Sequence, residues 1–455
     1  MSMGRAKGRQ MDLFVATSDL RAPGHPFYDR LNAALDRHRF DERVEAICAR
    51  YYCEGNDGRP SVPPGRYFRM LAIGYFENLG SERGIAWRCA DSLSLKAFLG
   101  LGPAEATPTH SALSRIRARL GKEAFEAVHL LILEVLKKER LVKGRKLALD
   151  STTMAANASM ASIVRRDTDE TYAEFVGRLA AEAGEVVASA EDRARFDRRR
   201  EGRETTNAEW ASPTDPDARV ARMKDGTTKL AYKAEHVVDA DTHAIVTTAL
   251  HAADRSDHAT APETLAEADA HLQAIGLSTV GATVIADKGY CSEAFVAGLV
   301  AAEMKPCVAE PRLRTKRRWK GKDEHVRRAC LANRRRVRGA AGRRLMRRRG
   351  ASVERSFQNV FDRGGQRQTH LRGHENNEKR NLVAVIAHNL GVWMRKLVGR
   401  ACPKALAALL SARKIALLTV RALIGVFATG LRLAADDRPV GGSRPRQNLD
   451  LRQAA

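Results

Sequence analysis

The first 145 residues carry apolar side chains at intervals of three and four positions. The spacing is clear at 63–80 (PPGRYFRMLAIGYFENLG) and at 122–141 (KEAFEAVHLLILEVLKKERL), where it makes one face of a helix apolar. We therefore predict an all-helical N-terminal domain over residues 1–140.

From residue 147 onward the pattern changes to short apolar runs rich in Val, Ile, Thr and Ala, which are typical of strands. The runs at 230–241 and 244–254 are joined by a tight turn at 241–243 and so predict a hairpin. Helical spacing separates the later runs, at 261–276, where Pro262 lies near the start and Gly276 at the end, and at 292–303. The strand runs lie at 147–157, 230–241, 244–254, 281–290 and 305–310.

The order of these elements predicts a mixed α/β sheet with an antiparallel part. Right-handed crossovers would place the strands that end in Asp150 and Asp287 in one sheet. The polar, charge-rich stretch at 159–229 predicts a helical insertion into a domain spanning residues 141–400. Residues 401–455 predict a C-terminal helix and a flexible tail.

Within that tail, residues 415–435 are apolar but contain Arg421 and Arg432, which favours a packing or partner helix over a membrane span. The seven cysteines include no C-x-x-C pair, which argues against a disulfide scaffold and a zinc module. The N-terminus is basic but has no apolar run of a secretory signal. These features favour a cytoplasmic protein that does not enter the membrane.

Positive charge is concentrated in one segment. The chain has 78 Lys and Arg against 54 Asp and Glu, a balance of +24, and residues 312–349 hold 18 of the basic residues with two acidic ones, a local balance of 18 − 2 = +16. A segment of this kind is expected to lie along nucleic-acid phosphates. The alternative is a solvated, disordered basic loop.

Three carboxylates have sequence positions that suit metal-dependent chemistry. Asp150 and Asp287 each follow a buried apolar run, and Glu354 opens a helical pattern directly after the basic segment. Carboxylates that converge repel one another unless a cation neutralises them, and Mg²⁺ prefers oxygen ligands. Taken one at a time, an Asp after an apolar run is more often a turn or capping residue than a metal ligand, and a Glu at a helix start usually interacts with the helix dipole.

Together the motifs resemble those of the DDE transposases of bacterial insertion sequences, over roughly residues 20–396. The boxes are LALDSTTMAANAS, YKAEHVVDADTHAIVTTALHAADRSDH, ADKGY, VERSFQ, RQTHLRG and IAHNL, in that order. The resemblance implies an RNase H-like mixed sheet with flanking helices, preceded by an all-α DNA-binding domain. It also implies two Mg²⁺ or Mn²⁺ ions at Asp150, Asp287 and Glu354, and DNA cleavage at the element ends followed by strand transfer into target DNA. Double-stranded DNA, as terminal inverted repeats and target, is the expected partner, with a homodimer on DNA.

The chain departs from the family at a Tyr-Arg-Glu-Lys signature around the third acid. The places of the Tyr, the Arg and the Lys are occupied by Arg347, Gly350 and Phe361. Basic residues that could take over the phosphate contacts lie nearby, and other candidates flank Asp287 or share one face of a helix. The predicted DNA-binding residues are Arg347, Arg348, Arg349, Arg363, Lys288, Tyr290, Arg115 and Arg119.

The sequence also allows two other functions. One is a catalytically idle DNA-binding protein descended from a transposase, which would not need the three acids. The other is an RNA-associated structural protein, which would explain the basic segment but not the carboxylates at the strand ends. A low aromatic content of 5% also offers little surface for stacking unpaired bases.

Overall fold

The computed structural model describes residue 20 and residues 24–53, 61–201, 207–223, 225–312, 319–408 and 412. The chain divides into two compact units, Met1–Pro403 and Lys404–Ala455. The apolar segment at 415–435 lies outside the described residues, so the prediction of a helix there is not addressed. No helix in the described part of the chain is long and apolar enough to cross a membrane.

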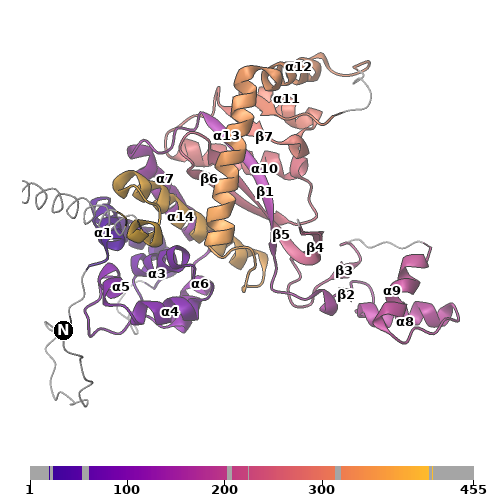
Figure 1. Ribbon diagram of the computed structural model, residues 1–455, viewed down its shortest axis with the longest axis horizontal. Coiled ribbons are helices and arrows are strands. Elements are labelled where there is room, and N and C mark those ends of the chain that lie inside the picture. The colour runs from indigo at the N-terminus through magenta and orange to yellow at the C-terminus, as the bar shows by residue number, and fades with distance from the viewer. Residues whose placement is uncertain are drawn as a thin grey trace, which may run out of the picture. The chain divides into compact units, whose positions relative to one another are not determined.

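The N-terminal region is helical, as predicted (Figure 1). Three helices begin at a Ser or Thr whose hydroxyl accepts a backbone N–H three residues later: Ser81, Ser92 and Thr109. The elements are α1 (Pro26–Arg37), α2 (Phe40–Cys48), η2 (Ala49–Tyr51), α3 (Pro64–Glu77), α4 (Glu82–Ala90), α5 (Leu93–Phe98), α6 (His110–Arg119) and α7 (Lys122–Lys138).

The second region is built on a six-stranded mixed sheet, which confirms the predicted fold class. The strand order is β4-β5-β1-β7-β8, and β6 also pairs with β5. The β1–β5 pair is antiparallel, whereas β1–β7 and β7–β8 are parallel. The strands are β1 (Lys146–Ala155), β4 (Arg219–Arg222), β5 (Thr228–Asp239), β6 (Ile245–Ala252), β7 (Thr283–Ala286) and β8 (Lys305–Val308).

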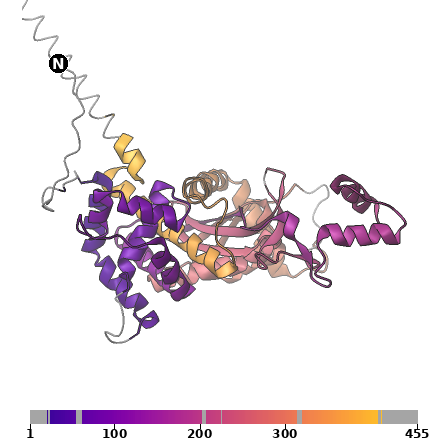
Figure 2. The ribbon, with the colours of Figure 1, turned by 90° about the horizontal axis from the view of Figure 1, so that it is seen from below.

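Helices cover the sheet on both faces (Figures 1 and 2). Since side chains alternate along a strand, one face of β1 and β5 presents Ala148, Met154 and Tyr232 to a core that also contains residues of α13. On the opposite face, α10 packs on β5 and β6. The remaining helical elements of this region are α10 (Asp257–Ala274), η4 (Lys288–Tyr290), α11 (Glu293–Ala301), α12 (Glu324–Arg338), α13 (Ala340–Phe357), the π-helix η5 (Gln358–Arg363) and α14 (His374–Val398).

The polar stretch after β1 contains its own small elements, joined to the sheet by β4. Rings of Phe175 and Trp210 meet edge to face at 5.6 Å, which gives this part an apolar contact of its own. The predicted end of the insertion at 229 is too late, because β4 pairs with β5 and so belongs to the sheet. The elements before β4 are η3 (Met160–Ser162), β2 (Val164–Arg165), α8 (Tyr172–Glu182), α9 (Ala190–Arg199) and β3 (Trp210–Ala211).

Two of the edge strands, β8 and β6, are each held by an asparagine side chain from a helix. Asn333 of α12 accepts the N–H of Val308 at 2.8 Å and donates to its carbonyl at 2.9 Å, and Asn389 of α14 makes the same pair of bonds to Ile245, both at 2.9 Å. An amide side chain thus replaces a further strand, and the edge groups are not left unpaired.

The basic segment is helical over most of its described length. It forms α12 and the first half of α13, whereas residues 313–318 lie outside the described residues. The prediction that Glu354 opens a helix is wrong, because α13 begins at Ala340 and Glu354 lies near its C-terminal end. Local spacing misplaced this start because the arginine-rich turns have too few apolar residues to mark a helix face.

Candidate active site

Asp150 of β1 and Asp287, the residue that follows β7, lie at the same level of two neighbouring parallel strands. Ala148 of β1 is paired with Ile285 of β7, and each aspartate follows two residues later in its strand direction. Ala148 and Ile285 both belong to the core under α13, so the alternation of side chains directs Asp150 to that face. Adjacent strands are about 4.8 Å apart, and the two carboxylates therefore share one edge of the sheet.

The two carboxylates interact electrostatically. Burial raises the pKa of Asp150, and the Asp287 carboxylate raises it further, whereas the Arg349 guanidinium and the Ser151 N–H lower it. Arg349 Nη1 donates to Asp150 Oδ2 at 2.7 Å, with 15% and 25% of the two side chains exposed. The site thus contains two neighbouring acids of which one is paired with a cation from α13.

Helix α13 also carries Glu354 over the sheet. On the face that it turns to the strands, Ser356 Oγ lies 3.2 Å from Nδ1 of His236, which is the cross-strand neighbour of Asp150. Glu354 itself is exposed. Among the described residues, no three His, Cys, Asp or Glu side chains are gathered closely enough to hold a metal ion. The predicted acidic triad therefore stays a prediction, with two of its members adjacent by register.

A further carboxylate, Asp257, lies beside the same strand ends and was not predicted as part of the site. Its Oδ2 lies 2.7 Å, and Asp287 Oδ1 3.2 Å, from where a Cβ on Gly289 would stand, so the two oxygens are at most 2.7 + 3.2 = 5.9 Å apart. Ser151 Oγ and Lys233 Nζ both donate to Asp257 Oδ1, at 2.9 and 3.3 Å. Asp257 belongs to the motif ADRSDH, which follows the hairpin, and this position in the sequence could have marked it as a candidate site residue.

Comparison with protein families decides the identity of this core. A family described as "Transposase DDE domain" matches residues 146–390, more than half of the chain, and one described as "Transposase domain (DUF772)" matches residues 16–119. The chain belongs to the DDE transposase family. No curated protein and no solved structure matches it.

The predicted DNA-contact residues of this transposase fall into distinct environments. Tyr290 is fully buried and donates to Glu235 at 2.8 Å, so its hydroxyl is occupied inside the protein rather than free for a phosphate. Arg349 is paired with Asp150, and Arg348 is exposed but pairs with Asp241 at 2.8 Å. The predicted residues that have exposed side chains are Lys288, Arg347, Arg348, Arg363, Arg115 and Arg119.

Two of these exposed arginines lie on α6 in the N-terminal region. Arg115 and Arg119 are four residues apart and so share one helix face. The Arg119 guanidinium also lies over the Tyr52 ring, 5.0 Å from its centroid. The exposed side chains of Arg115 and Arg119 could contact DNA phosphates or form a solvated helix surface.

Proposed function

We propose that this transposase cleaves DNA at the ends of an insertion sequence and transfers the strand to target DNA. The observation that supports it most directly is the placement of Asp150 and Asp287 at the same level of adjacent parallel strands. Helix α13 packs on that face and carries the third predicted acid, Glu354. A DNA-binding protein without catalysis would gain nothing from two half-buried, mutually repelling carboxylates.

The donor set fits Mg²⁺ or Mn²⁺. Asp150 and Asp287 offer hard carboxylate oxygens; burial, and to a smaller extent the Asp287 carboxylate, raises the pKa of Asp150, and a bound cation would relieve both effects. We propose that Asp150, Asp287 and Glu354 would hold the two ions. When bound, such ions activate the attacking oxygen and stabilise the leaving one.

The chain's own residues would bind and orient the DNA. Exposed arginines of α12 and α13 offer phosphate contacts on the helices that lead to Glu354. The Gly289 N–H donates to Asp287 Oδ1 at 2.8 Å and holds this carboxylate at the strand end. We further propose a homodimer on DNA, because two element ends must be held for coordinated cutting.

The direct test is Mg²⁺-dependent cleavage of a duplex that carries the element's terminal inverted repeat. Asp150→Asn, Asp287→Asn and Glu354→Gln should each abolish cleavage and largely spare DNA binding, because phosphate contacts elsewhere dominate affinity. Glu303→Gln, an exposed carboxylate in the same region, is the matched control and should cleave normally. Wild-type binding without cleavage under all divalent cations would instead favour the idle DNA-binding protein.

A further inference from the structure

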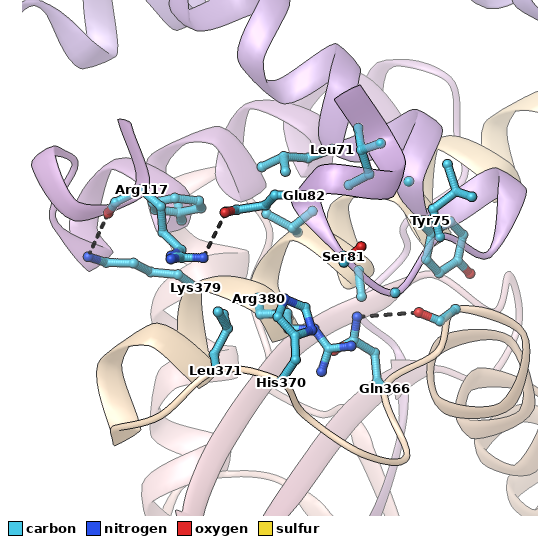
Figure 3. A pocket seen from close by; sticks show the side chains of 18 of the residues that line it. Leu71, Tyr75, Ser81, Glu82, Arg117, Gln366, His370, Leu371, Lys379 and Arg380 are labelled. Atoms are coloured by element: carbon cyan, nitrogen blue, oxygen red, sulfur yellow. Dashed lines mark hydrogen bonds and ion pairs between the residues drawn. The ribbon is translucent and has the colours of Figure 1, made fainter. Parts of the chain in front are cut away.

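A small cavity lies between the N-terminal helices and the segment that follows the π-helix η5. Its volume is about 70 Å³, and Figure 3 shows that side chains of α3, α4 and α6 meet those of α14 and of residues 364–371 there. The cavity is separate from the carboxylates, since neither Asp150 nor Asp287 lines it. Gln366, His370 and Arg380 lie together in Figure 3.

Arg380 brings a positive charge to this cavity without a carboxylate partner. Its guanidinium donates to the carbonyl oxygens of Gly365 at 2.7 Å and of Gln368 at 3.3 Å, and within the described part of the chain no ion pair holds it. Burial lowers the pKa of Arg380 to about 10. Because a guanidinium stays protonated at neutral pH, Arg380 keeps a desolvated positive charge that two carbonyl oxygens solvate but no carboxylate neutralises.

The other charges that line the cavity are already paired. Arg117 Nη1 lies 2.7 Å from Glu82 Oε1. Lys379 Nζ lies 2.6 Å from Glu375 Oε1. One positive charge, that of Arg380, is left over.

Gln366 gives a second and independent indication of a missing ligand. Its side chain lines the cavity and is only 7% exposed, yet its Oε1 has no hydrogen-bond partner among the described residues. The amide nitrogen makes one long bond, to the Gly364 carbonyl at 3.4 Å. The Nε of Arg117 in the same lining is also buried without a partner. Buried polar atoms of this kind are rare unless a ligand or water satisfies them.

We propose that this cavity binds one phosphate group, and specifically the terminal phosphate of a DNA strand. By this measure a cavity needs about 10–15 Å³ to hold one water and one of about 150 Å³ admits benzene, so a cavity of about 70 Å³ suits a tetrahedral oxyanion and not a base. Arg380 matches the charge and the oxygens of a phosphate. A terminal phosphate has a second pKa near 6, so it keeps a hydroxyl part of the time at neutral pH, and that hydroxyl can donate to Gln366 Oε1. An internal phosphodiester has no such hydrogen.

The assignment of the phosphate to a DNA end rests on the proposed function. Hydrolysis of a strand at the element end frees a 3′-hydroxyl on one side of the cut and leaves a 5′-phosphate on the other. The oxyanion chemistry does not rest on it. Inorganic phosphate offers the same oxygens, so the test separates the two sources.

Calorimetric titration with inorganic phosphate, at ionic strength matched with chloride, tests the oxyanion site. Arg380→Gln should weaken binding about tenfold or more, as expected for a lost charge-assisted hydrogen bond. Because Arg380 also holds two carbonyls, Gln366→Glu is the second variant: it leaves those bonds in place and adds a carboxylate that repels phosphate. Arg372→Gln, at an exposed arginine outside the lining, should bind as wild type does. If wild type does not bind phosphate, or if all variants bind alike, the site is refuted.

Duplexes that end in a 5′-phosphate or a 5′-hydroxyl then test the source. Wild type should prefer the phosphorylated end, and Gln366→Glu should lose that preference. Equal affinity for both ends, with phosphate binding retained, would overturn the DNA-end assignment in favour of free phosphate. Neither measurement depends on cleavage, so an inactive transposase can still pass both, and an active one can fail both.

Discussion

Replacing Arg349 should show how much its ion pair with Asp150 contributes to the stability of the fold. A matched substitution at Arg348 accounts for the general effect of removing a positive charge. In Arg349→Gln, Asp150 loses its cation but keeps the neighbouring Asp287 carboxylate, which already raises its pKa. A charge-assisted hydrogen bond between two mostly buried groups contributes about 2 kcal/mol, so we expect a loss of about this size in the absence of divalent cations.

The adjacent residue supplies the control. Arg348 pairs with Asp241 at a similar distance, but 46% of its side chain is exposed, and Asp241 keeps Lys146 at 3.1 Å. Exposed pairs contribute less than about 1 kcal/mol, so Arg348→Gln should change stability little. Both variants remove one positive charge from the same helix.

The assay is urea unfolding with and without Mg²⁺. A cation that binds only the folded protein adds RT ln(1 + [L]/Kd) to its stability. Because Arg349 competes with a cation for Asp150 Oδ2, the Mg²⁺-dependent gain should be larger in Arg349→Gln than in wild type. Equal midpoints for the two variants without cation would refute the reasoning, and so would an Mg²⁺ response that the Arg349 substitution leaves unchanged.

Three further predictions follow from buried polar contacts. Asn389→Leu leaves the N–H and carbonyl of Ile245 unpaired at an edge strand, and should cost about 2–4 kcal/mol in chemical unfolding; a change below 1 kcal/mol would mean that water replaces the amide. Gly289→Ala places a Cβ 2.7 Å from Asp257 Oδ2 and should reduce cleavage by displacing the Asp287 loop, whereas Gly298→Ala, which has open space, should not. Burial lowers the pKa of three core histidines, namely His129 (about 3), His236 (about 3) and His388 (about 4). With unfolded values near 6.5, the unfolded chain binds more protons below that pH, so stability should be constant above about 6.5 and fall below it by up to about 1.4 kcal/mol per pH unit for each residue; equal stability at pH 7 and pH 5 would contradict this.

Local sequence determined the elements that depend on near neighbours. The pattern predicts a strand at 147–157, and β1 runs over Lys146–Ala155; it also predicts the hairpin of β5 and β6, which turns at residues 240–244. Apolar residues repeat every two positions in a half-buried strand and every 3.6 in a half-buried helix. This spacing can be read from the sequence without knowing the tertiary structure. The placement of Asp150 and Asp287 after apolar runs could be seen for the same reason.

The tertiary structure decided which side chains meet. The level pairing of the two aspartates depends on the register of strands 137 residues apart, and the partner of Arg349 depends on how α13 lies across them. Tyr290 was predicted as a DNA contact because it follows Asp287, yet packing turns it into the core against Glu235. Charge and spacing along a chain do not reveal the direction of a side chain, because that direction is set by long-range packing, in which elements distant in sequence compete for the same buried volume.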